Sequence, residues 1–65
     1  MSEDKAQWTT QELADEAARR GRPISREYVR RLCADGTIYA TKPGTDWLIP
    51  DWSAQRWLDE WLNAD

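Results

Sequence analysis

The sequence contains no histidine and no phenylalanine, and it has a single cysteine. One cysteine cannot form a disulfide within the chain, and without histidine neither a Cys/His zinc site nor a histidine-based catalytic pair can be built. No apolar run approaches the roughly 20 residues of a membrane span, and the first residues lack the pattern of a signal peptide. These absences predict a reduced, cytoplasmic protein that is not an enzyme and has no metal, cofactor or membrane partner.

Tryptophan, by contrast, is abundant, with five residues in a chain of 65. A chain of this length forms one small domain and buries only about 60% of the surface that its unfolded form exposes, so its core needs large side chains. We expect one domain over residues 8–62, between a frayed or disordered segment at 1–7 and a C-terminal tail at 63–65.

The net charge of −3 is the sum of three regions of opposite sign. Residues 1–18 and residues 46–65 each carry a net charge of −4, whereas residues 19–45 carry +5 from six arginines and one lysine against two carboxylates. Nucleic-acid-binding proteins usually carry a basic patch, so the total charge argues weakly against such a partner. The basic middle region argues for one.

Two helix starts occur in the first half of the chain. Thr9, followed three residues later by Glu12, has the pattern of a capping box and predicts a helix over about residues 10–20. Ser25 can cap a second helix, which ends at Gly36. The short connection between the two helices contains glycine and proline, and it predicts a helix-turn-helix.

After the second helix the sequence changes to the pattern of strands. Residues 38–41 and 47–49 are rich in β-branched and aromatic side chains, and they flank a Pro-Gly pair typical of a turn. This arrangement predicts a short β-hairpin.

A last helix is expected after the hairpin, with Asp51 as its cap. Trp57 and Trp61 lie on its apolar stripe and are expected in the core together with Trp47. Trp52 falls off the stripe and is expected to cover the hairpin.

The second helix carries the pattern that points to a function. Val29, Leu32 and Cys33 have the spacing of a core-facing stripe, so the cysteine thiol is expected to be buried and inert. The side of this helix opposite the apolar stripe carries charged side chains, among them Glu27, Arg30 and Arg31. A helix fits the DNA major groove, and arginine can bind a guanine edge with two hydrogen bonds. A charged face that is merely solvated is the alternative.

The order of these elements resembles the small winged helix-turn-helix domains of phage and plasmid excisionases, which are related to the DNA-binding heads of MerR-type regulators. The similarity covers roughly residues 8–62, and the matching segments are 8–14, 24–32, 36–40, 47–50 and 57–58. The fold implied by the resemblance is mainly α with a small β-hairpin, in which three helices are joined by a two-stranded wing.

The resemblance also implies two groups of DNA-contacting residues. The recognition-helix group is Ser25, Arg26, Glu27, Tyr28, Arg30 and Arg31. The wing group is Thr41, Lys42, Gly44 and Thr45. Lys42 is the only cation of the expected wing, where many members of this family carry several.

Three functions are compatible with these residues. In the first, the protein is an excisionase that binds repeated sites on double-stranded DNA, bends the DNA and assists integrase in prophage or plasmid excision. In the second, it is a small transcriptional regulator with the same DNA-binding surface. In the third, it is a protein–protein adaptor that docks through its acidic, Trp-rich last helix.

For the DNA-binding functions we expect a monomer in solution that assembles cooperatively on DNA. An acidic end of one copy would then contact a basic cluster of the next in a head-to-tail arrangement, which extends along the duplex rather than closing into a dimer. The expected contact residues are Arg19, Arg20 and Arg22.

Overall fold

The computed structural model describes residues 6–64, which form three helices and a small two-stranded sheet. The elements in chain order are β1 (Gln7–Trp8), α1 (Thr10–Arg19), α2 (Arg26–Asp35), β2 (Ile49–Pro50) and α3 (Asp51–Asn63). The fold is therefore mainly helical, as the sequence predicts. The expected fraying of residues 1–5 and the end of the expected tail at residue 65 lie outside the described residues.

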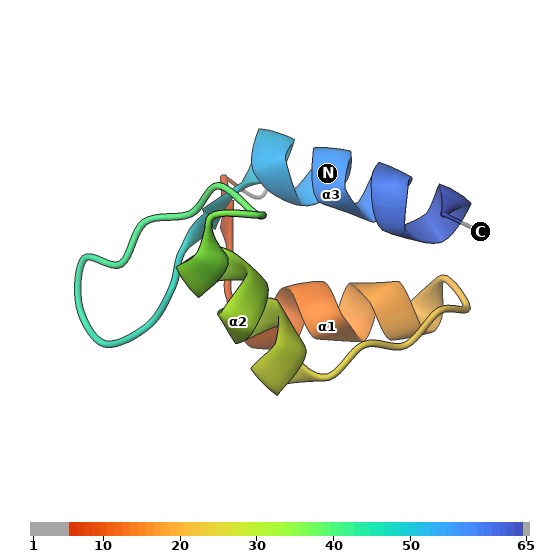
Figure 1. The fold of residues 1–65 in the computed structure, drawn as a ribbon, viewed down its shortest axis with the longest axis horizontal. Coiled ribbons are helices and arrows are strands. Elements are labelled where there is room, and N and C mark those ends of the chain that lie inside the picture. The colour runs from red at the N-terminus through yellow and green to blue at the C-terminus, as the bar shows by residue number, and fades with distance from the viewer. Residues whose placement is uncertain (1–5, 65) are drawn as a thin grey trace.

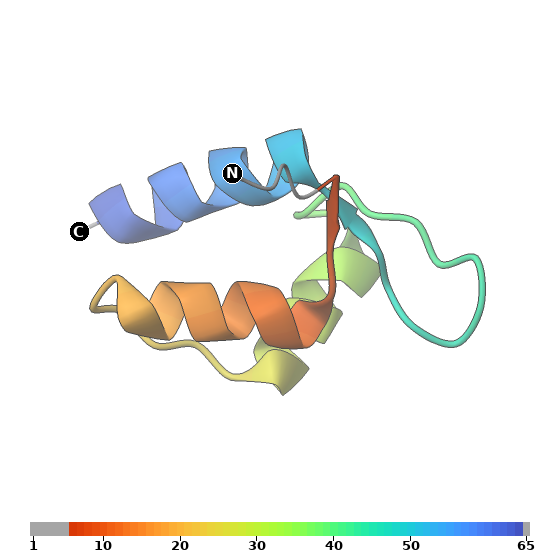
Figure 2. The ribbon, with the colours of Figure 1, turned by 180° about the vertical axis from the view of Figure 1, so that it is seen from behind.

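The helices are arranged around the short sheet at one end of the molecule. α1 and α3 leave the sheet side by side in the same general direction, and α2 packs across the start of α1 (Figures 1 and 2). The α2–β2 loop (residues 36–48) projects from the body beside α2 (Figure 1). The molecule is flat, with Cα extents of 33 × 32 × 16 Å.

The two predicted helix starts are confirmed. The Thr9 Oγ1 accepts the N–H of Glu12 at 3.1 Å, and the Glu12 carboxylate accepts the N–H of Thr9 at 2.9 Å, which completes the capping box. The Ser25 Oγ accepts the N–H of Tyr28 at 3.1 Å. Gly36 ends α2 with a φ of +88°, a left-handed conformation that glycine adopts without steric cost.

The predicted hairpin is wrong in extent. Residues 38–41 and 47–49 do not form two paired strands, because only Thr41 and Leu48 bridge, with N–H···O distances of 2.9 and 2.7 Å. Ile49 pairs instead with Trp8, in an antiparallel β1–β2 sheet that the sequence did not predict. This register is favoured because both side chains are buried in the core. Gln7, which was expected to be frayed, belongs to β1.

Asp51 does not cap α3, so that prediction is also wrong. Pro50 occupies the N-cap position and makes no side-chain cap hydrogen bond, while Asp51 is the first helical residue. The reason is the strand pairing, which places Trp8 beside the start of α3. The Asp51 Oδ1 therefore accepts the indole N–H of Trp8 at 2.9 Å, a side-chain bond between residues 43 positions apart.

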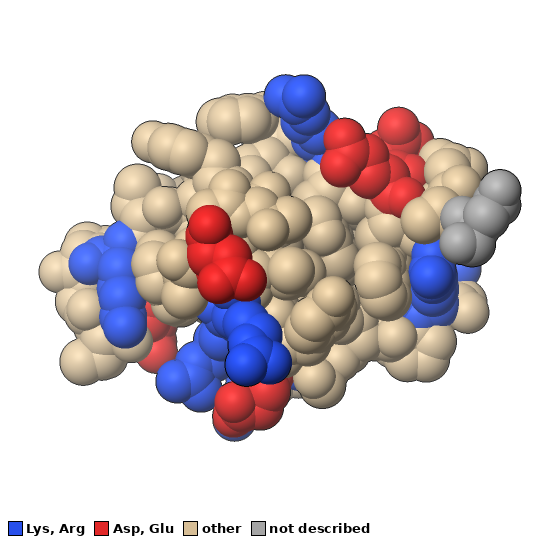
Figure 3. All heavy atoms as spheres, viewed as in Figure 1, with Lys and Arg blue, Asp and Glu red and all other residues tan. Residues whose placement is uncertain are grey.

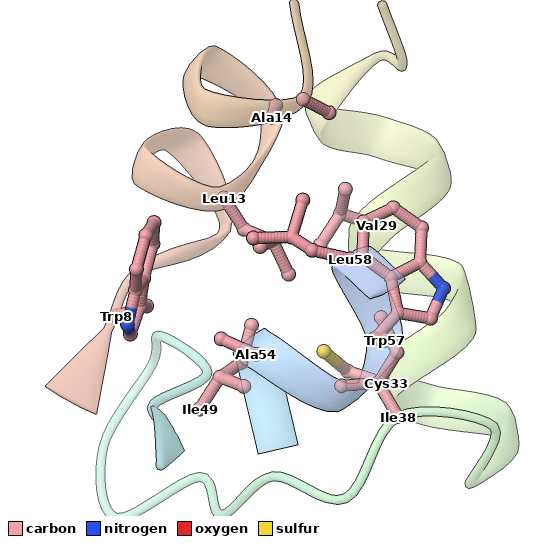
Figure 4. Packing of buried hydrophobic residues seen from close by; sticks show 11 residues of the cluster. Trp8, Leu13, Ala14, Val29, Cys33, Ile38, Ile49, Ala54, Trp57 and Leu58 are labelled. Atoms are coloured by element: carbon pink, nitrogen blue, oxygen red, sulfur yellow. The ribbon is translucent and has the colours of Figure 1, made fainter. Parts of the chain in front are cut away.

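The core forms where the three helices and the sheet meet (Figure 4). The residues that fill it come from all five elements and from the α2–β2 loop. They are Trp8, Leu13, Ala14, Ala17, Val29, Cys33, Ile38, Ile49, Ala54, Trp57 and Leu58. The expectation that Cys33 is buried is confirmed, and burial raises the pKa of its thiol to about 11.

The tryptophans divide between the core and the surface. Trp57 is only 8% exposed, as predicted, and it stacks on the half-buried Trp61 with ring centroids 5.4 Å apart. Trp47 is also half-buried. Trp52 is 57% exposed and stacks on Tyr39 of the α2–β2 loop, with centroids 5.4 Å apart. Within the described part of the chain, no helix is long and apolar enough to cross a membrane.

Candidate nucleic-acid interface

The outer face of α2 and the α2–β2 loop enclose one open groove of about 700 Å³. α2 exposes this face because its buried side chains, Val29 and Cys33, lie on the opposite side of the helix. We call this the α2–loop groove. Its lining residues are Ser25, Glu27, Tyr28, Arg30, Arg31, Ala34, Lys42 and Trp47. The structure therefore brings five of the six expected recognition-helix residues together with the one cation of the expected wing.

The three cations of the groove differ in what holds them. Arg31 makes no hydrogen bond or ion pair with any residue from 6 to 64. Arg30 is loosely paired, with its Nη1 3.5 Å from the Glu27 carboxylate one helical turn earlier. The Lys42 Nζ lies 5.3 Å from the centroid of the Trp47 ring, within the range of a cation–π contact. Arg31 is thus the cation most available to a ligand.

Charge of both signs lies on the face that carries the groove. Figure 3 shows Lys and Arg side chains over α2 and the α2–β2 loop, with acidic side chains among them, and a second group of acidic side chains over α3. Basic side chains are therefore the more frequent over α2 and the loop, and acidic ones over α3. A polyanion would meet less repulsion at α2 and the loop than along α3.

Ser25 and Tyr28 have structural roles besides lining the groove. The Ser25 oxygen caps α2 through the Tyr28 N–H, so it is already used as an acceptor. The Tyr28 ring lies 6.4 Å from that of Trp61 and remains 44% exposed. The two hydroxyl groups can still donate to a phosphate oxygen.

The remaining expected residues lie outside the groove. Arg26 and Thr45 line a second, smaller recess between the starts of α1 and α2 and the loop. Thr41 forms the single bridge to Leu48, and Gly44 is exposed near the tip of the loop. The structure therefore places eight of the ten expected residues in the groove or in the smaller recess beside it, and Thr41 and Gly44 in neither.

The three arginines expected to contact a neighbouring copy are engaged within the chain. Arg19 and Arg20 both pair with the Glu16 carboxylate, at 3.2 and 2.7 Å. Arg22 donates to the carbonyls of Trp61 and Ala64 at the end of α3, and its Cζ lies 4.2 Å from the centroid of the Trp61 ring. The Trp61 indole N–H donates in return to the Arg22 carbonyl at 2.9 Å. Arg22 is therefore a structural residue that joins the α1–α2 connection to α3.

Sequence reasoning missed one feature of this surface. Trp47 is expected in the core, yet it also forms a wall of the groove, and only the position of the loop could reveal this. Trp52 stacks on Tyr39 of segment 38–41, in agreement with the expectation that it covers this segment. The two rings border another recess of about 260 Å³, which Arg56 and Glu60 also line.

Comparison of the chain with protein-family models, with curated proteins and with solved structures found no match. The chemistry of the site is therefore defined by its own residues. Two arginines, one lysine, two hydroxyl groups and one carboxylate line a groove that is open to solvent. Such a surface can bind a polyanion and donate hydrogen bonds to it, while the Glu27 carboxylate can only accept. Among residues 6–64, no group of three His, Cys, Asp or Glu side chains could hold a metal ion.

Proposed function

We propose that this protein binds double-stranded DNA, with α2 as the recognition helix and the α2–β2 loop as a wing. The observation that supports the proposal is that the outer face of α2 and Lys42 of the loop line one open groove. A helix with its side chains is about 10–12 Å across, which matches the roughly 12 Å width of the major groove. The proposed fold is accordingly a winged helix-turn-helix.

The division of labour between the cations follows from their surroundings. Arg31 has no partner among residues 6–64, so its guanidinium can bind a guanine edge without breaking another bond. Arg30 first has to leave Glu27, a surface pair that costs little to break. Lys42 is proposed to contact a phosphate, because a flexible ammonium group binds as a point charge.

The test compares two arginines that differ in position. Duplexes that bind the protein are first selected from a random pool, and affinities are then measured by fluorescence anisotropy for the selected duplex and for a scrambled one. Arg31→Ala is expected to weaken binding to the selected duplex by about 1–3 kcal/mol. It should also reduce the preference of the protein for the selected duplex over the scrambled one. Arg56→Ala is the control, because it removes the same charge from α3, outside the groove.

Equal losses from Arg31→Ala and Arg56→Ala would mean that total charge, and not the groove, governs binding. Failure of the random pool to yield any bound duplex would remove the proposal altogether.

Within DNA binding, the narrower role that we propose is that of an excisionase, which the resemblance to that family supports. This role requires several copies on adjacent sites and a bent duplex, whereas a transcriptional regulator requires neither. Energy transfer between dyes at the two ends of the selected duplex measures the bend. A straight duplex at saturating protein would favour the regulator.

A second candidate function is docking of a protein partner on α3. The observation that favours it is the Tyr39–Trp52 stack, in which both rings are more than half exposed. The sequence predicts docking through a Trp-rich helix, but Trp57 is buried and Trp61 is bound to Arg22. Among the described residues of α3, Trp52 at the start of the helix is therefore the tryptophan that is more than half exposed.

A further inference from the structure

A second recess, of about 220 Å³, lies beside the α2–loop groove. It is formed where the start of α1, the start of α2 and the α2–β2 loop meet. Its lining residues are Thr10, Arg26, Arg30, Thr45, Asp46 and Trp47. Arg30 and Trp47 line both the recess and the groove, so the two are direct neighbours.

The polar groups of the recess suit a single oxyanion. Two guanidinium groups and two hydroxyl groups can donate hydrogen bonds, whereas the one carboxylate, on Asp46, can only accept. Within the described part of the chain, Asp46 forms no ion pair with either arginine. The formal charge of the lining residues is therefore +1, which one phosphodiester group would neutralise.

Arg26 is directed toward this recess and away from the groove. Its Nη1 lies 3.5 Å from the Gln11 Oε1 of α1, and Gln11 is itself held by Asp15 at 2.9 Å. Arg26 lines the recess but not the groove, while Arg31 lines the groove but not the recess. The two arginines are thus placed for different ligand groups, although they lie on the same helix.

We propose that the recess binds one phosphate of the DNA backbone, with Arg26 as a positioning residue and the hydroxyl groups of Thr10 and Thr45 as further donors. This inference rests on the proposed function, since it assigns a part of the same duplex to a second site. A contact to the backbone fixes the position of α2 on the duplex but carries no sequence information, which the neighbouring groove supplies. Asp46 opposes the phosphate and limits how tightly the recess binds any anion.

The test measures Arg26→Ala and Arg31→Ala on the selected and the scrambled duplex over a range of salt concentrations. Arg26→Ala is expected to reduce the affinity for both duplexes by the same factor, on the order of tenfold at low salt. It should also reduce the magnitude of the slope of log affinity against log salt by about 1. Asp46→Asn is expected to raise the affinity for both duplexes, because it removes the negative charge that opposes the phosphate. Thermal melts establish that each variant is folded.

A neutral methylphosphonate, placed at one backbone position at a time, identifies the phosphate. At one backbone position, the methylphosphonate should weaken binding of the wild type. At that same position it should cause no further loss of affinity in Arg26→Ala, which already lacks the contact. A change in the preference between the two duplexes on Arg26→Ala, or additive losses at every backbone position, would overturn the phosphate site while leaving the proposed function intact. Wild-type protein that binds neither duplex would overturn both.

Discussion

At the scale of single residues, Arg22 shows how one side chain can complete a helix that belongs to another part of the chain. The last carbonyls of any α-helix lack partners within the helix. In α3, two of these carbonyls accept from the Arg22 guanidinium, and the Trp61 ring packs against the same group. A planar guanidinium can donate to two acceptors and stack at once, whereas an ammonium group cannot do so in the same geometry.

Replacing Arg22 should therefore reduce stability without touching the candidate site. Arg22→Ala is expected to lower the free energy of unfolding by about 2 kcal/mol, because hydrogen bonds from a charged donor contribute about 1.5–3 kcal/mol. Arg22→Lys should recover only a small part of this. Urea denaturation measures the effect, and Arg19→Ala, which removes an exposed ion pair, is the control with a change below about 1 kcal/mol. A stable Arg22→Lys variant would mean that the contact acts through charge alone.

The Cys33 thiol makes stability depend on pH at the alkaline end. Burial raises its pKa from 9.0 to about 11, so between these values the unfolded chain loses a proton that the folded chain keeps. The unfolded state is then favoured as pH rises, and stability present below pH 9 is lost toward pH 11. At pH 10 this loss is expected to be about 1 kcal/mol relative to pH 8.

Because tyrosine and lysine also titrate in this range, the measurement is a difference between two proteins. Urea midpoints at pH 8 and pH 10 are compared for the wild type and Cys33→Ala. The wild type should lose more stability than the variant over this interval. Identical pH dependences would show that the thiol is accessible or ionised in the folded state.

At the scale of elements, α3 carries two tryptophans in opposite environments. Trp57 is 8% exposed in the core, and Trp52 is 57% exposed on the other side of the same helix. A helix of this kind contributes to the fold mainly through its buried stripe. The same substitution at the two positions therefore separates packing from surface contact.

Trp57→Ala is expected to cost about 3–5 kcal/mol, comparable with the whole stability of a chain this size, so its cooperative melt should disappear. Trp52→Ala should melt within a few degrees of the wild type. Circular dichroism at 222 nm follows both transitions. Retention of a normal melt by Trp57→Ala, or its loss in Trp52→Ala, would contradict the burial that the structure assigns to these rings.

The elements that could be predicted from the sequence are those specified by neighbouring residues. Thr9 with Glu12, and Ser25 with Gly36, act over one turn of helix, and both helices begin where these residues place them. The pairing of Trp8 with Ile49 depends on residues 41 positions apart, and no local pattern encodes a strand of two residues.

The candidate site was predictable to the same degree. Periodicity alone places Arg30 and Arg31 on the exposed face of α2. Periodicity also places Arg26 on the flank of that face. Which recess Arg26 and Arg31 line could not be predicted, because it depends on where the α2–β2 loop lies in space.

At the scale of the whole molecule, the separation of charge is the dominant property. A middle region of +5 lies between two regions of −4, although the total is only −3. Residues of the middle region line the α2–loop groove and the recess of about 220 Å³ beside it. Acidic side chains gather over α3. A duplex should therefore meet the protein in one orientation.

The dependence of affinity on salt tests this orientation. With seven cations in the middle region, we expect about three to five phosphate contacts per copy. Each contact contributes about 0.9 to the slope of log affinity against log salt, so the slope should lie between about −3 and −4.5. A slope near zero would support the protein-docking function instead.

Assembly on DNA is the second prediction at this scale. The protein is expected to be a monomer in analytical ultracentrifugation and to bind tandem sites cooperatively. The double variant Arg19→Glu with Arg20→Glu should reduce cooperativity more than the affinity for a single site, because both side chains are exposed and are proposed to contact the neighbouring copy. Glu16→Gln is the control, because it removes their shared partner on α1 without reversing their charge. A symmetric dimer in the absence of DNA would contradict this mode of assembly.

The flat shape of the molecule determines how far apart adjacent copies can lie along the DNA. A base pair rises about 3.4 Å along the duplex axis, so a body of 33 Å occupies about ten base pairs, close to one full turn, while its 16 Å thickness occupies about five. Copies aligned with a long dimension along the duplex would repeat on the same side of it, and copies aligned with the short dimension would alternate between opposite sides. The period of a hydroxyl-radical footprint over tandem sites therefore reports which axis of the protein follows the DNA.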